Sequence, residues 1–294
     1  MSRTDVPVPD VPVPYVLAPA RLGPVTLRNR IIKSATYEGL SRHGLVTDAL
    51  VDFHVRTAAD GVGYLVSSFL SPRINRRRDS YGGPLENRAR LARNVARAVR
   101  DAAGDRIAIT VKLNLDDGVR GGFSLNEAVT VAQWLERDGS VDALELTAGS
   151  SLLNPMYLFK GDAPVREFAA AMPAPLRPAV RILGQRLIRP YPYRDAYLLA
   201  GARKVRDAVS LPLIVLGGIT SKKVMDQAMT EGFQFVAMGR ALLMEPDLVN
   251  RIREDATVTS RCAHCNKCVP TIYSAARCVL VEPTPANPAP RVIA

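Results

Sequence analysis

The sequence has no long apolar run and few cysteines, and both shortages narrow the class of protein. No stretch approaches the roughly 20 apolar residues that cross a bilayer. The N-terminus lacks the basic segment followed by an apolar one that marks a signal peptide. The four cysteines, Cys262, Cys265, Cys268 and Cys278, lie in one C-terminal cluster. Without an export signal, such a cluster indicates metal binding in a reducing compartment. We therefore expect a cytoplasmic protein with no membrane segment.

The basic residues of the chain are not clustered in any one segment. Its 294 residues carry a formal net charge of +11, and only seven of the 39 basic residues are lysine. The arginines are scattered, whereas nucleic-acid-binding proteins gather basic residues in stripes interleaved with aromatics. We therefore expect a solvated basic surface and no nucleic-acid partner. Such a surface still favours ligands that carry phosphate.

Proline-rich segments mark both ends of the chain, and we expect disordered tails at residues 1–16 and 281–294. Between them, residues 17–280 form one domain in which β-branched runs alternate with amphipathic stretches. A hairpin is expected at residues 22–27. The five clear strands are expected at residues 30–35, 107–113, 143–147, 213–216 and 235–238, with a doubtful sixth at 63–67. Helices are expected at residues 51–59, 85–103, 124–138, 196–209 and 222–231.

This alternation predicts an α/β protein with a parallel sheet and helical crossovers. Near-continuous apolar strands such as PLIVLGG (residues 212–218) fit burial on both faces. No G-x-G-x-x-G follows the first strand, which disfavours a dinucleotide-binding fold. We therefore predict a TIM-type (β/α) barrel that is incomplete, with about six strands instead of eight.

Two late segments point to a phosphate. Gly217 and Gly218 end one strand, Gly239 and Arg240 end the next, and a helix follows each pair. Glycine lets backbone amides approach a phosphate, and arginine supplies a charge-assisted contact. The loops after the last two strands are the recurrent phosphate site of this barrel. The alternative is that these glycines only make tight turns, and we favour phosphate binding over it.

Several longer blocks resemble the signature segments of the Old Yellow Enzyme family of NADH:flavin oxidoreductases, in the family's order. The blocks are NRIIKSAT (29–36), the segment 63–90 that contains SPRINRR and YGGPLENR, VKLN (111–114), GGFS (121–124) and AMGR (237–240). The resemblance covers residues 17–280 with one gap. It implies bound FMN, with NAD(P)H as hydride donor and an activated alkene or related small molecule as acceptor.

The resemblance also assigns roles to single residues. The backbone of residues 34–36 would hold the flavin ring, and Tyr37 stands where the family usually has a Thr or Cys. Lys112 matches the cation beside the N1–O2 edge, which stabilises the anionic reduced ring. A chance inward lysine is the alternative, but a barrel strand rarely buries an unpaired ammonium. The implied cofactor-binding residues are Ser34, Ala35, Thr36, Tyr37, Lys112, Gly149, Gly217, Gly218, Gly239 and Arg240.

The match breaks at the substrate motif H-x-x-[N/H]-G-Y-L. Tyr64, the implied proton donor, is present, but Ala59 and Val62 occupy the positions of the pair that grips the substrate carbonyl. On the order of a hundred residues, about two to three strand–helix units, are missing between about residues 60 and 64. The barrel must therefore close with fewer strands, pair with another chain as a homo-oligomer, or stay open.

Two functions remain open: an NAD(P)H-dependent ene-reductase type of enzyme with impaired activity, and an inactive flavin-binding or partner-binding remnant. An unrelated barrel for sugar phosphates is a weaker third.

The cysteine cluster has the spacing C-x-x-C-x-x-C followed by a remote fourth cysteine, Cys278. Such a run can hold an iron–sulfur cluster. The resemblance adds a [4Fe–4S] cluster at this place in some relatives, but with one more residue between the second and third cysteines. Zinc, with His264 replacing one cysteine, and four unliganded thiols are the alternatives.

Overall fold

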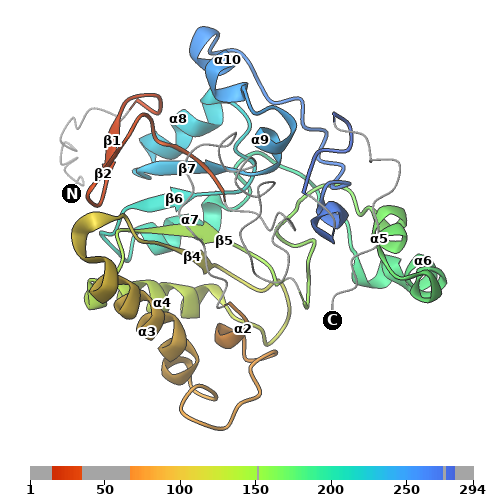
Figure 1. Ribbon diagram of the computed structural model, residues 1–294, viewed down its shortest axis with the longest axis horizontal. Helices are drawn as coiled ribbons and strands as arrows, with labels where there is room; N and C mark the ends of the chain where they lie inside the picture. The colour runs from red at the N-terminus through yellow and green to blue at the C-terminus, as the bar shows by residue number, and fades with distance from the viewer. Residues whose placement is uncertain (1–14, 35–66, 151, 274–275, 282–294) are drawn as a thin grey trace, which may run out of the picture.

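The centre of the molecule is a parallel sheet, seen in a computed structural model that describes residues 15–34, 67–150, 152–273 and 276–281. Its strands are β3 (Ile31–Lys33), β4 (Thr110–Asn114), β5 (Ala143–Thr147), β6 (Leu213–Val215) and β7 (Phe235–Met238). Their spatial order is β3-β7-β6-β5-β4. Figure 1 shows β7, β6, β5 and β4 side by side in this order. The first strand therefore pairs with the last, as in a closed β/α barrel, and β3 and β4 are the two edges.

The five clear strands of the sequence prediction are confirmed, and they make up the parallel sheet of the described residues. Most of the doubtful strand at residues 63–67 lies outside the described part, and Ser67 opens helix α2 (Ser67–Leu70). The break between β3 and β4 falls where the sequence indicates missing units. Ser34, directly after β3, donates a hydrogen bond to Glu145 on β5 at 2.6 Å and accepts one from Lys112 on β4 at 2.7 Å. The sheet is therefore curled like the arc of a barrel.

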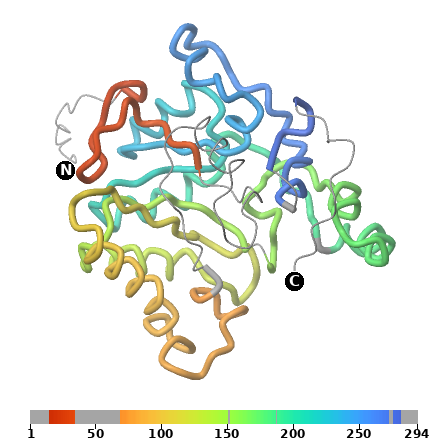
Figure 2. The backbone as a smooth tube through the Cα atoms, viewed as in Figure 1, coloured from red at the N-terminus to blue at the C-terminus, as the bar shows by residue number. Residues whose placement is uncertain are grey.

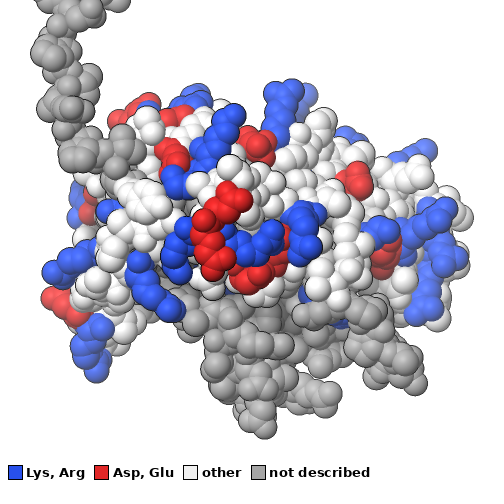
Figure 3. Space-filling view, turned by 90° about the horizontal axis from the view of Figure 1, so that it is seen from above, with Lys and Arg blue, Asp and Glu red and all other residues white. Residues whose placement is uncertain are grey.

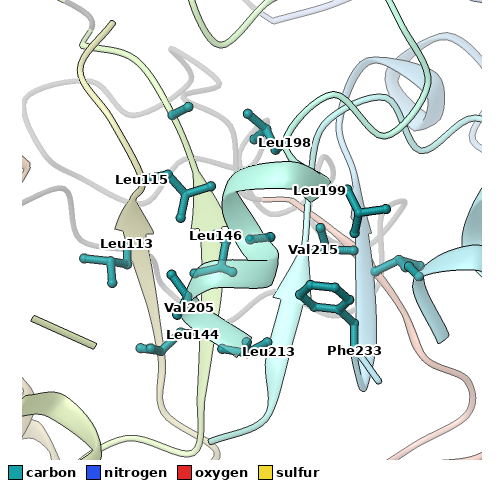
Figure 4. Packing of buried hydrophobic residues seen from close by; sticks show 14 of the residues in the cluster. Leu113, Leu115, Leu144, Leu146, Leu198, Leu199, Val205, Leu213, Val215 and Phe233 are labelled. Carbon is teal, nitrogen blue, oxygen red and sulfur yellow. The ribbon is translucent and has the colours of Figure 1, made fainter. Parts of the chain in front are cut away.

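Helices cover the outer face of this arc. The helices that pack there are α3 (Leu85–Ala103), α4 (Leu125–Asp138), α7 (Leu199–Arg206) and α8 (Lys222–Thr230). Figure 4 shows Val205 of α7 near Leu144 and Leu213 of the strands, and Leu199 near Val215. Burial of these side chains removes apolar surface from water at roughly 25 cal/mol per Å² and holds the helices to the sheet.

Helices α5 (Val165–Ala171) and α6 (Arg177–Leu187) lie in the connection after β5, and α9 (Arg240–Met244) and α10 (Leu248–Glu254) follow β7. Ala241, Leu248 and Ile252 of the last two helices belong to the main core. Short 3₁₀ segments are found at Gly104–Arg106, Ala174–Leu176 and Val269–Tyr273. Figure 2 shows α5 and α6 in green at the end of the molecule opposite the N-terminal hairpin. A separate small core of Met156, Phe168, Ile188 and Val269 joins them to the C-terminal segment.

Local signals explain where two of the helices begin. Ser124 caps α4 and forms a capping box with Glu127. The helix expected at residues 196–209 starts later, at Leu199, and ends at Arg206. Ala196 has a φ of 48° and donates its amide to the Gly218 carbonyl at 3.1 Å, so it cannot continue the helix. The helix expected at residues 51–59 lies outside the described residues.

The N-terminal hairpin closes the inner face of the arc. Strands β1 (Ala20–Leu22) and β2 (Val25–Leu27) pair antiparallel, and Ala20 and Leu22 pack with inward residues of the sheet. The hairpin turn needs glycine, because Gly23 has a φ of 54° and a Cβ there would lie 2.6 Å from the Asp142 carboxyl group. Val16, the last residue of the expected N-terminal tail, is fully buried, and residues 1–14 lie outside the described part.

The surface carries charges of both signs. Figure 3 shows basic and acidic side chains interleaved over the face that it displays. Paired arginines tie helices together: Arg93 binds Asp138 through two hydrogen bonds of 2.7 Å, and Arg203 binds Glu231 in the same way at 2.7 Å. Among the described residues, no helix is long and apolar enough to span a bilayer.

Candidate functional site

A polar cluster lies inside the curl of the sheet. Lys112 and Glu145 are direct partners across β4 and β5, with Nζ and Oε1 3.0 Å apart. Ser34 binds both, and all three side chains are largely buried. The buried ammonium of Lys112 is thus paired with a carboxylate. The role implied for Lys112 beside a flavin ring stays a prediction.

The glycines after β6 and β7 differ in the space around them. Gly218 has a φ of 76°, and a Cβ there would lie 2.7 Å from the Ala196 nitrogen and the Arg194 oxygen. Gly217 is similar, with a φ of 98° and a close approach to the side chain of Leu198 at 2.7 Å. Gly239, by contrast, has no other atom within 4 Å of its ideal Cβ position. The first two glycines are required by packing, whereas Gly239 faces open space that a ligand can occupy.

Ser34 joins these two parts of the site. Its side chain binds the Lys112–Glu145 pair, and its amide donates to the Met238 carbonyl at 3.0 Å, directly before Gly239. Ser34 therefore connects the side chain of Lys112 with the carboxyl end of β7 at Gly239. Ala35, Thr36, Tyr37 and the implied proton donor Tyr64 lie outside the described residues.

Arg240 binds protein groups in addition to lining this edge. Its Nη1 donates to the Lys160 carbonyl at 3.0 Å and to the side-chain oxygen of Asn266. Burial raises the pKa of neighbouring Tyr197, and the positive charge of Arg240 opposes that rise. Arg240 thus connects the loop after β5 with the cysteine segment, a role that the sequence did not indicate.

The segment Leu158–Asp162 is fixed along its whole backbone. Its five carbonyls accept hydrogen bonds from the Tyr197 hydroxyl at 2.7 Å, Asn266 Nδ2 at 2.7 Å, Arg240 Nη1 at 3.0 Å, the Tyr191 amide at 3.2 Å and Asn266 Nδ2 at 2.8 Å. Asn266 is buried, and its left-handed φ of 57° suits asparagine. Gly149 packs beside this segment: it has a φ of 85° and donates its amide to the Asp116 carbonyl at 2.7 Å.

The sequence missed two of these residues for different reasons. Glu145 stands in the strand ALELT, where a carboxylate facing the same side as Lys112 is a readable signal for a buried pair. Asn266 sits between cysteines in C-x-H-C-N-K-C, and nothing in that pattern predicts hydrogen bonds to the loop after β5. Its contacts depend on two loops that meet only in the folded chain.

The four cysteines line one cavity of about 20 Å³, together with Arg240 and Asn266. All four are free thiols. Burial raises the pKa of the Cys262 thiol and raises that of Cys268 to about 12, while the charge of Arg240 opposes both shifts. His264 stacks on Tyr193, with ring centroids 3.4 Å apart. In the described ranges, no group of three His, Cys, Asp or Glu side chains is arranged to hold a single metal ion.

Comparison with known proteins agrees with the geometry. Residues 57–149 match the model of the NADH:flavin oxidoreductase / NADH oxidase family. The chain is 42% identical over 272 residues to 4,4'-dithiodibutanoate disulfide reductase of Rhodococcus erythropolis, covering 89% of this chain and 66% of that protein. It is 29% identical over 236 residues to an NADH oxidase of Thermoanaerobacter brockii, covering 80% of this chain and 29% of that protein.

A solved structure shows the same fold. The 6-hydroxypseudooxynicotine amine oxidase from Pseudomonas geniculata N1 aligns with a TM-score of 0.60 at 16% identity, over 88% of this chain and 52% of its own. This chain thus spans at most about two thirds of the relatives compared. It belongs to the NADH:flavin oxidoreductase family, that of the Old Yellow Enzymes, and is truncated relative to these relatives.

Proposed function

We propose that this chain binds FMN at the carboxyl edge of its sheet and uses NAD(P)H to reduce a small-molecule acceptor, with a disulfide as the preferred class. One observation carries the proposal: Ser34 connects the Lys112–Glu145 pair with the open space at Gly239. A flavin nucleotide needs a cation beside its ring and room for a phosphate at a neighbouring strand end.

The residues present fit FMN. Lys112 would lie beside the ring, and Gly217, Gly218, Gly239 and Arg240 would surround the phosphate. When bound, the flavin supplies the means to accept a hydride and pass it on. The chain contributes a largely buried cluster in which the positive charge of Lys112 would stabilise negative charge on a bound flavin more strongly than in water.

The missing carbonyl-binding pair favours a disulfide over an alkene. Ala59 and Val62 cannot donate side-chain hydrogen bonds, and each lost donor typically costs about 2.7–4 kcal/mol in the transition state of a carbonyl substrate. A disulfide has no carbonyl to polarise. Its reduction consumes one NAD(P)H and one proton and releases two thiols. The Rhodococcus relative is named for such a reaction on 4,4'-dithiodibutanoate, a disulfide dicarboxylate.

The proposal is tested by incubating the FMN-loaded chain anaerobically with NADH or NADPH and one acceptor. The disulfide dicarboxylate should oxidise the nicotinamide and release two thiols for each one consumed, whereas a simple enone should react far more slowly. Turnover of the enone alone, lost in Tyr64→Phe, would support the ene-reductase reading instead. Bound FMN without turnover of either acceptor would identify an inactive remnant.

We further propose that the cysteine cavity holds a [4Fe–4S] cluster. Four thiols are the donor set for such a cluster, and each binds a different iron, so they need not converge on a single point. Arg240 supplies positive charge against the negative cluster. Anaerobic reconstitution with iron and sulfide should give iron–sulfur absorbance in the chain and none in Cys268→Ala. Tight binding of zinc instead, or of no metal, contradicts this assignment.

A further inference from the structure

The loop after β5 holds a lysine ammonium against two aromatic rings. Lys160 Nζ lies 4.1 Å from the ring centroid of Tyr157 and 4.2 Å from that of Tyr191. The two rings meet edge to face with centroids 5.5 Å apart, and Asn154 donates to the Tyr191 hydroxyl at 2.7 Å. Within the described ranges, this ammonium forms no ion pair with a carboxylate. Its positive charge is therefore not neutralised by a direct partner there.

The position of this ammonium is fixed by the two rings and by the backbone of its own segment. Lys160 belongs to the segment Leu158–Asp162, whose five carbonyls are all hydrogen-bonded. Lysine loses much side-chain freedom when it is held in place, so an ordered lysine needs a compensating interaction. Burial lowers the pKa of Lys160, and the carboxylate of Asp116 acts in the opposite direction. Direct binding of an anion stabilises a partly desolvated cation of this kind.

The ammonium also lies on the same edge of the sheet as the flavin residues. Its own carbonyl accepts from Arg240, which follows β7. Tyr157 packs on Gly118 in the loop after β4, where a Cβ would lie 2.3 Å from the ring. Asn154 bridges the two loops by donating to the Gly118 carbonyl at 2.9 Å. The ammonium is thus framed by the loops that follow β4 and β5.

We propose that Lys160, framed by Tyr157 and Tyr191, binds a carboxylate group of the substrate at a distance from the bond that is reduced. The inference rests on the proposed function, since it assigns the substrate class of that same site. The preferred acceptors are acids, and their esters are poor substrates. The carboxylate of Asp116 acts on the charge of Lys160, so removing the charge of Asp116 should strengthen binding of the acid.

The test compares the disulfide dicarboxylate with its dimethyl ester. Direct binding is measured by calorimetry on the FMN-loaded chain, and KM and kcat are measured separately. Lys160→Met should weaken binding of the acid by roughly 10- to 100-fold, the range for a charge-assisted hydrogen bond, and leave the ester nearly unchanged. Lys160→Arg should restore most of the acid's affinity, because arginine keeps the charge and also stacks on aromatic rings.

The outcomes separate the subsite from the reaction. If the acid binds selectively through Lys160 but no thiol is released, the subsite stands and the proposed reaction fails. If turnover occurs and Lys160→Met affects acid and ester equally, the subsite is wrong and the reaction stands. Should Lys160→Met not fold, Asp116→Asn decides: a several-fold gain for the acid alone supports the proposal, and an unchanged ratio of acid to ester overturns it.

Discussion

At the scale of single residues, the Lys112–Glu145 pair governs the electrostatics of the candidate site. The two side chains lie 3.0 Å apart in the largely buried interior of the arc. Charges act more strongly there than in water, because the surroundings screen them less. The carboxylate cancels part of the lysine charge, so Glu145 limits how far this site stabilises an anionic reduced ring.

This balance predicts opposite shifts of the flavin midpoint potential. Lys112→Met should lower it by roughly 30–60 mV, because losing a charge-assisted contact of about 1.5–3 kcal/mol disfavours the reduced anion. Glu145→Gln should raise it, and the double variant should lie near the wild type. Anaerobic spectroelectrochemical titration measures all three. Equal potentials in every variant would show that the pair does not contact the flavin.

Glu245 predicts how stability depends on pH. Its carboxylate is buried and binds Arg251 at 2.6 Å, the Arg261 amide at 2.6 Å and the Ser260 hydroxyl at 2.9 Å. Burial alone would raise its pKa, but these hydrogen bonds hold the pKa at about 2, against an ordinary value of 4.5. A depressed folded pKa gives stability that is complete above pH 4.5 and is lost as the pH falls toward 2.

Glu245→Gln should therefore lower the free energy of unfolding at pH 7 by about 3 kcal/mol, and the difference from the wild type should shrink below pH 4.5. Urea denaturation at several pH values measures this difference. Glu254→Gln, at an exposed position on α10, is the control and should stay near the wild type. A deficit of Glu245→Gln that is constant from pH 7 down to pH 3 contradicts the role given to its charge.

Part of this residue-level picture was readable in the sequence. Lys112, Gly218 and Gly239 could be predicted because a lysine within an apolar strand, or a glycine directly after one, is recognisable in the sequence. Lys160 and Asn266 were not found, since their roles come from neighbours more than 25 residues away, such as Tyr191 for Lys160 and Phe159 for Asn266. Long-range contacts of this kind have no local pattern.

At the scale of elements, helix α4 is held by its capping box. Ser124 accepts from the Glu127 amide, and Glu127 also binds Arg88 of α3 at 2.5 Å. Ser124→Ala should lower the free energy of unfolding by about 1 kcal/mol, because an amide of the first turn loses its partner. Urea denaturation compares it with Ser210→Ala, an exposed serine outside any cap. Equal stability of the two variants would show that the capping box contributes nothing.

The two glycine positions predict different outcomes for the same substitution. Gly218→Ala should destabilise the fold, because its φ is 76° and the new Cβ would meet backbone atoms at 2.7 Å. The Cβ of Gly239→Ala would lie in open space, so this variant should have the same urea midpoint of unfolding as the wild type. If a phosphate approaches Gly239, this variant should nevertheless bind FMN several-fold more weakly. Unchanged FMN affinity in Gly239→Ala would place the phosphate elsewhere.

The strands and long helices were predictable because each buries one continuous apolar surface. Strands β5 and β7 are apolar apart from Glu145 and Thr147, and α3 has the predicted bounds. Helices α5 and α6 were not predicted, since prolines divide them and much of α6 is exposed. Their position depends on the small core around Met156 and Phe168, which joins segments far apart in the sequence.

At the scale of the whole molecule, the strands of the sheet follow the order found in a β/α barrel, but they do not close the barrel. Strand β3 pairs with β7, as the first and last strands of a barrel do, while β3 and β4 are linked through the side chains of Ser34 and Lys112. The phosphate side and the lysine side of the site both belong to the part of the barrel that is present. We therefore expect flavin binding to survive the truncation better than substrate activation does.

The most direct test of this account is an equilibrium titration of the flavin-free chain with FMN, followed by its absorbance and fluorescence. We predict saturable binding of one FMN per chain that survives gel filtration and is weakened in Lys112→Met and Gly239→Ala. A chain that is folded by circular dichroism but leaves the FMN spectrum unchanged and elutes without flavin would contradict the account.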